Sequence, residues 1–153
     1  MRRFFTVALL IMRKDLRVET RSRELFLTTL FFSVSTVLVF AFGFVRDGRP
    51  VENAVAGILW IAIAFAGTLA LGRTFERERY HDVLRALLLA PVDRPAIYVG
   101  KLLGILALLA AVEVVIVPLV ALLFQAPLFR QPILTFLLLS LGTLGFSAVG
   151  TLF

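Results

Sequence analysis

The sequence has no cysteine and only one histidine, His81. The lack of cysteine excludes disulfides, thiolate metal sites, covalent haem attachment and thiol redox chemistry. A lone histidine has no partner ligands for a metal or for haem, the HExxH zinc motif is missing, and no Ser-His-Asp or Cys-His catalytic set can be assembled. We therefore expect a chain that is not an enzyme, with His81 a solvated loop residue and no cofactor or metal bound directly.

A phosphate-binding loop is also missing. The only Gly-Lys pair, Gly100-Lys101, is followed by Leu102 where the motif needs Ser or Thr, and Pro95 stands where it needs its first glycine. The chain therefore binds no nucleotide in this way. Any ATP would have to be hydrolysed on a separate partner subunit.

Charge is almost absent from four long hydrophobic runs. The 153-residue chain is 60% hydrophobic and 17% charged, with a mean hydropathy of +0.98, which is too apolar for a soluble domain of this size. The runs cover residues 25–45, 54–72, 102–124 and 132–153, and Glu113 is the only charged residue inside them. About twenty helical residues cross a bilayer. We therefore predict an all-α fold, a polytopic membrane helix bundle with four spans.

Basic residues indicate how the spans are oriented. Seven of the sixteen Lys and Arg residues precede the first run and six lie in the loop 73–101, whereas the two other loops share the remaining three. The positive-inside rule then predicts that the N-terminus and the loop 73–101 are cytoplasmic. Because topology accounts for the net charge of +6, we do not expect nucleic acid as a partner.

Residues 1–24 are predicted to form a cytoplasmic interfacial amphipathic helix. Apolar side chains recur there at helical spacing beside a basic stripe. The apolar residues are Phe5, Leu9, Met12 and Leu16, and the basic ones are Arg13, Arg17 and Arg21. Lying along the inner leaflet, this helix either acts only as an orientation signal or docks a partner.

Small residues suggest where the helices approach one another. Ala62, Ala66 and Ala70 repeat every fourth residue, and Gly100 is followed by Gly104. Such spacing lets helix backbones come close together in a membrane.

Glu113 lies near the middle of the third run, where an ionised carboxylate is costly and is expected to face protein or water. It either belongs to a substrate or proton pathway or forms a polar contact with a Ser or Thr of a neighbouring helix. Pro118 follows on the same helix and is expected to kink it.

A short amphipathic helix is predicted within the loop 73–101. Asp82 can cap this helix, which covers the eight residues from Val83 to Ala90. Eight residues can neither cross a bilayer nor form a stable helix alone. The helix must therefore pack either on the membrane surface or in a groove of a cytoplasmic protein, as a coupling helix for a separate ATPase. The residues expected to make that ATPase contact are Asp82, Val83, Leu84, Leu87, Leu88 and Pro91.

This loop carries a resemblance to a known family. The segment ERERYHDVLRALLLAPVDRPAIYVGK resembles the cytoplasmic loop of ABC exporter permeases, in which a charged run leads into a leucine-rich coupling helix, a proline and then Gly-Lys at the next span. The string LLLAPVDRPAIYVGKLLG, preceded by GILWIAIAFAGTLALGR, more narrowly resembles the CcmB family of haem exporter permeases. General exporter permeases often show Gly-Thr-Leu-Glu where this chain reads HDVLRA, which favours the narrower likeness.

The resemblance implies a permease subunit of a cytochrome c maturation ABC transporter in the bacterial inner membrane. Its implied partners are a cytoplasmic ABC ATPase, other cytochrome c maturation membrane subunits and a second copy of itself. ATP hydrolysis on the partner would be coupled to haem handling at the outer face, with haem either conducted or moved through a neighbour. Family members have six spans, and the fourth run reaches Phe153 without a basic residue, so we expect a truncated permease.

Three other functions stay open on the residues alone. One is an ABC permease that exports a lipid, a drug or a polysaccharide. The second is a membrane enzyme that uses Glu113 with another titratable group, and the third is a passive scaffold without an ATPase.

Overall fold

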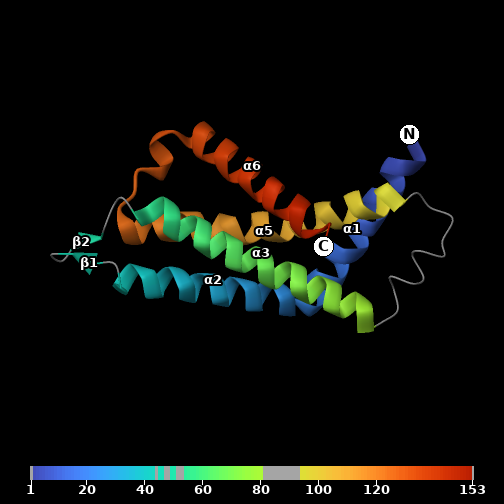
Figure 1. The fold of residues 1–153 in the computed structure, drawn as a ribbon, viewed down its shortest axis with the longest axis horizontal. Helices are drawn as coiled ribbons and strands as arrows, with labels where there is room; N and C mark the ends of the chain where they lie inside the picture. Colours follow the sequence, from blue (N-terminus) through green and yellow to red (C-terminus); the bar gives the residue numbers. More distant parts are fainter. Residues whose placement is uncertain (1, 44, 47–48, 51–53, 81–93, 153) are drawn as a thin grey trace.

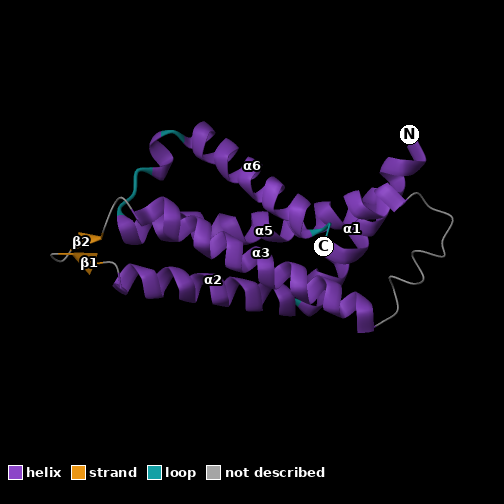
Figure 2. Cartoon of the chain, in the orientation of Figure 1, coloured by secondary structure: helices purple, strands orange, loops and turns teal. Residues whose placement is uncertain are grey.

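The computed structural model describes residues 2–43, 45–46, 49–50, 54–80 and 94–152. Almost all of them are helical, as Figure 2 shows. The chain order is α1 (Arg2–Ser22), α2 (Glu24–Gly43), β1 (Val45–Arg46), β2 (Arg49–Pro50), α3 (Val55–Tyr80), α5 (Arg94–Phe124), η2 (Leu128–Arg130) and α6 (Pro132–Gly150). The predicted helical membrane bundle is thus confirmed.

Four of these helices are long and apolar enough to cross a membrane. The qualifying segments are Glu24–Gly43, Val55–Glu76, Pro95–Phe124 and Pro132–Gly150, one in each of the four predicted runs. Helix α5 continues through Pro118. Two helices also extend past the predicted runs, because α3 lasts to Tyr80 and α5 already begins at Arg94. The connection between these two helices is therefore much shorter than the loop 73–101.

The first two helices are separated by a single residue. Arg23 has a φ of 53°, a left-handed conformation that stops α1 and turns the chain into α2. The backbone N–H of Phe26, in the first turn of α2, donates a hydrogen bond to the Glu19 carboxylate at 2.7 Å. Glu19 therefore caps α2 from the preceding helix, where a negative charge also suits the helix dipole.

The other described connections are short. Strands β1 and β2 pair antiparallel between α2 and α3, with Arg46 opposite Arg49. Helix α5 ends at Phe124, the next residue Gln125 has a φ of 50°, and the Ala126 N–H donates to the Ala121 carbonyl at 3.2 Å. This is a Schellman-type C-cap, which satisfies a carbonyl of the last turn.

The core lies between α3, α5 and α2. Ala62, Ala66 and Ala70 are completely buried on one face of α3. They pack with a row of buried apolar residues on α5 and with Val37 of α2. The predicted close packing of this alanine series is confirmed. Helix α6 is the most peripheral span, with only 11% of its apolar window buried, against 50% for α3.

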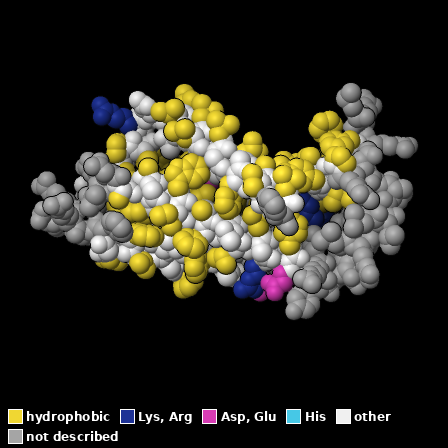
Figure 3. All heavy atoms as spheres, in the orientation of Figure 1, with side chains coloured by type: hydrophobic (Ala, Val, Ile, Leu, Met, Phe, Trp, Pro, Cys, Tyr) yellow, Lys and Arg dark blue, Asp and Glu magenta, His cyan; other side chains and the backbone are white. Residues whose placement is uncertain are grey.

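The ends of the spans gather at opposite ends of the bundle. Helix α1 runs obliquely across the end where α3 finishes, α5 starts and α6 finishes, whereas β1, β2 and η2 lie at the other end (Figure 1). Hydrophobic side chains spread over the helices on the face shown in Figure 3. Among the described residues, the charged side chains of the two ends are thus separated by a middle in which Glu113 is the only charged side chain, the pattern of a membrane-spanning bundle.

Candidate functional site

The predicted coupling residues lie outside the part of the chain that the structure describes. This applies to His81, Asp82, Val83, Leu84, Leu87, Leu88 and Pro91. The segment is nevertheless bounded on both sides, because α3 is helical to Tyr80 and α5 is helical from Arg94. Each flank is an uninterrupted helix that belongs to a membrane span. A force on residues 81–93 would therefore reach two spans without passing through a flexible loop.

The first two turns of α5 are covered by α1. Ala8 and Ile11 of α1 are buried, as are Ala96 and Gly100 of α5. A Cβ atom at Gly100 would lie 2.8 Å from the Ala8 carbonyl oxygen and 2.8 Å from the Ile11 Cβ, which is too close for any side chain. The absence of a side chain at Gly100 thus allows the two helices to touch through their backbones, as the small-residue spacing predicted.

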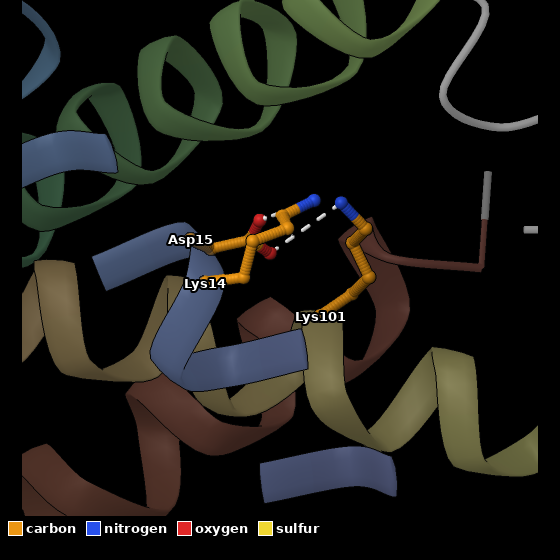
Figure 4. A network of polar contacts seen from close by, with 3 residues as sticks. All are labelled: Lys14, Asp15 and Lys101. Carbon is orange, nitrogen blue, oxygen red and sulfur yellow. Dashed lines mark hydrogen bonds and ion pairs between the residues drawn. The ribbon is translucent and has the colours of Figure 1, made fainter. Parts of the chain in front are cut away.

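An ion pair joins the same two helices beside this contact. The Lys101 ammonium on α5 lies 3.4 Å from the Asp15 carboxylate on α1, and Lys14 lies 2.9 Å from the other oxygen of that carboxylate. Figure 4 shows that both ammonium groups approach the Asp15 carboxylate, one at each of its oxygens. The Lys101 side chain is only 7% exposed, whereas Asp15 is 22% and Lys14 46% exposed. The Lys101 pair is thus the shielded one, where screening by water is weakest.

Two further polar contacts tie this end of the bundle together. The Tyr98 hydroxyl of α5 donates to the Ala148 carbonyl of α6 at 2.7 Å. Arg73 of α3 lies 3.9 Å from Glu24 of α2. The base of α5 is therefore held to α1 on one side and to α6 on another. We call the cluster Asp15, Tyr98, Gly100 and Lys101 the base cluster.

Glu113 lies deeper in the bundle, between α5 and α6. It is half-buried, and its carboxylate accepts a hydrogen bond from the Thr143 hydroxyl of α6. This hydrogen bond is a polar contact of the kind that the sequence left open for Glu113. Among the described residues, no three His, Cys, Asp or Glu side chains come together to hold a metal ion.

Reasoning from the sequence missed three residues of this region. Asp15 is 86 positions from Lys101, and nothing local links the two. Glu19 stands among other charges in a basic helix, and no motif or spacing marks Tyr98. The one available signal was Gly100, which indicated a close helix contact without naming the helix that makes it.

Comparison with known proteins then gives the family. The family model described as "CcmB protein" matches residues 6–153. The chain is 27% identical over 94 residues to "Heme exporter protein B" of Escherichia coli strain K12 and, equally, to that of Shigella flexneri. The aligned part covers 61% of this chain and 43% of each relative, so the match spans less than half the length of these proteins. No solved structure matches. The family match extends over nearly the whole chain, and the chain therefore belongs to the CcmB protein family.

Proposed function

We propose that this chain is a membrane permease subunit of an ABC transporter for haem export and cytochrome c maturation. The observation that carries the proposal is the CcmB family match over residues 6–153, together with relatives named heme exporter protein B. The four membrane-spanning helices are consistent with it. In this proposal the chain is not catalytic, and ATP is hydrolysed by a cytoplasmic partner.

The proposed mechanism begins at the segment between α3 and α5. The apolar side of a short helix there, with Leu84, Leu87 and Leu88, would sit in a groove of the ATPase. Movement of that groove would shift the ends of α3 and α5 together. The base cluster supports this idea, because Lys101 and Tyr98 would pass the displacement of α5 to α1 and α6.

The chain's part in haem handling would be to transmit force. Haem iron is commonly held by His or Cys, and the sequence has no cysteine and a single histidine in the segment proposed to be cytoplasmic. We therefore propose that haem, as the substrate, is taken up by other maturation subunits at the outer face while this subunit drives the change. In this arrangement the N-terminus is cytoplasmic, the membrane is the bacterial inner membrane, and the complex contains two copies of the chain.

The test is co-purification with an ABC ATPase subunit of the same organism. Leu87→Asp and Leu88→Asp each place a charge on the proposed contact, so we expect both to abolish co-purification and cytochrome c maturation while membrane insertion is unchanged. Phe129→Asp is the matched control. Phe129 is equally apolar and 61% exposed, but it lies in η2 at the opposite end of the bundle.

The outcomes separate cleanly. Loss of the ATPase with the two Leu variants but not with Phe129→Asp supports the proposal. Full retention of the ATPase by both Leu variants contradicts the coupling role. Co-purification that is lost without any effect on cytochrome c maturation contradicts the haem assignment and leaves a permease for another cargo.

A further inference from the structure

Helix α1 has three distinct faces. The first faces the bundle, where Ala8 and Ile11 pack against α5 and Asp15 pairs with Lys101. The packing of Ala8 and Ile11, together with the Asp15–Lys101 pair drawn in Figure 4, fixes the rotation of α1 about its own axis. The two remaining faces therefore have defined directions, and each can be examined for what it would bind.

The second face is apolar and uncovered. Phe5 is 66% exposed and Leu9 is 57% exposed, although both belong to the apolar stripe that the sequence showed. In a helix, positions 5 and 9 lie one turn apart on the same side, and this side flanks the one that holds Ala8 and Ile11. The part of the apolar stripe formed by Phe5 and Leu9 is thus left uncovered by the described part of the chain, whereas Met12 and Leu16 of the same stripe are partly buried.

The third face is basic. Arg13, Arg17 and Arg21 are all exposed and follow one another at four-residue intervals, so they form one stripe along the helix. The stripe lies beside the apolar face and roughly opposite the face that packs on α5. From Arg13 to Arg21 the stripe covers eight residue steps, which is about 12 Å along the helix.

The position of α1 determines which partner can meet both faces. The helix lies across the bundle end at which α2 and α5 begin and α3 and α6 finish (Figure 1). Spans that cross a bilayer end at its headgroups, so α1 lies at headgroup depth. Exposed phenylalanine and leucine beside an arginine stripe match that layer, since the apolar face can enter the acyl boundary and the guanidinium groups can bind phosphates.

We propose that α1 binds anionic phospholipid headgroups through Arg13, Arg17 and Arg21, with Phe5 and Leu9 inserted into the leaflet. Because Asp15 and Lys101 join α1 to α5, this binding anchors the base of α5 to the anionic membrane surface. The inference does not depend on the proposed transport function. A protein partner is the other class of ligand for a basic stripe, and the following test distinguishes it.

The experiment uses the full chain in lipid nanodiscs. Since the chain has no cysteine, Thr20→Cys gives a single labelling site on α1, exposed and close to the basic stripe. A fluorophore at this site is quenched by a headgroup nitroxide carried at equal mole fraction on either phosphatidylglycerol or phosphatidylcholine. We expect the quenching to show that phosphatidylglycerol is enriched at least about fivefold over phosphatidylcholine beside α1. Each basic residue near an anionic surface contributes about 1 kcal/mol of binding free energy, which is about fivefold in the binding constant. The enrichment should fall in 1 M salt, where screening acts over about 3 Å.

Variants assign the effect to the stripe. The triple Arg→Gln change at positions 13, 17 and 21 should reduce the enrichment to about one, and the triple Arg→Lys change should retain most of it. Arg130→Gln is the matched control, because Arg130 is exposed at the opposite end of the bundle. Equal quenching by both lipids in the unaltered protein would overturn the proposal, as would enrichment that survives either 1 M salt or the triple Arg→Gln change. Quenching only by a water-soluble nitroxide would also overturn it, and would leave the stripe to a protein partner.

Discussion

Replacing Asp15 by Asn should release α1 from the base of α5 while the spans stay folded. The substitution keeps the shape of the side chain and removes the charge that faces the Lys101 ammonium at 3.4 Å. The Lys101 side chain is 7% exposed, so little water can reach its ammonium to replace the lost carboxylate. The free-energy cost therefore falls on the contact between the two helices.

The size of the cost follows from the burial of the two partners. Removing one partner of a fully buried ion pair costs about 3–5 kcal/mol, and an exposed pair is worth about 0–1 kcal/mol. With Asp15 22% exposed and Lys101 7% exposed, this pair lies between these limits, and we expect about 2–3 kcal/mol. That corresponds to a change of about 30- to 150-fold in the equilibrium for opening of α1.

Hydrogen exchange in nanodiscs measures that equilibrium directly. Amides of α1 should lose about 30- to 150-fold in protection in Asp15→Asn, while those of α2 and α3 keep theirs. Lys14→Met is the control, because Lys14 contacts the same carboxylate but is 46% exposed, so its removal should cost less than about 1 kcal/mol. The double change Asp15→Leu and Lys101→Leu should recover most of the protection, since no buried charge remains.

The reasoning is refuted if Asp15→Asn and Lys14→Met give the same protection in α1. It is equally refuted if the double variant is less protected than Asp15→Asn alone. Either result would mean that packing around Ala8 and Ile11, rather than the ion pair, holds the two helices together.

Three further changes test other contacts. Gly100→Val places a side chain against the α1 backbone, so α1 should detach, with loss of α1 protection at least as large as in Asp15→Asn. Thr143→Val removes the hydrogen bond to Glu113 between α5 and α6, and it should lower resistance to unfolding in SDS by about 0.6–1.7 kcal/mol, with unchanged resistance arguing against the contact. Glu19→Ala removes the carboxylate that caps α2 at Phe26, so about 0.5–2 kcal/mol of protection should be lost in the first turn of α2 and not in its centre.

The spans could be read from the sequence because the signal is strong and local. About twenty residues with at most one charge can be buried only in a membrane or in a large core, so each of α2, α3, α5 and α6 covers most of one predicted run. The alanine series of α3 was equally readable, since positions four apart must share one helix face. The helix boundaries were harder to predict from the sequence, because a polar helical extension such as the end of α3 has the amino-acid composition of a loop.

The contacts between helices could not be read in this way. The apolar stripe with Phe5 and Leu9 was visible, yet α1 packs through Ala8 and Ile11 on the adjacent face. The backbone of α1 at Ala8 comes close to Gly100 of α5, and a large side chain in place of either residue would keep the two helices apart. A Ser or Thr partner for Glu113 was one of two expectations, but only the fold selects Thr143.

The length of α5 has a mechanical consequence. Its 31 residues extend about 46 Å, whereas the hydrocarbon core of a bilayer is about 30 Å thick. About 16 Å of the helix therefore lies outside the hydrocarbon core. If the lipid acts as a fulcrum at the midpoint, a tilt of about 10° sweeps each tip through roughly 4 Å. A rod of this kind works as a lever, in which a modest pull at one tip produces a matching swing at the far side of the bilayer.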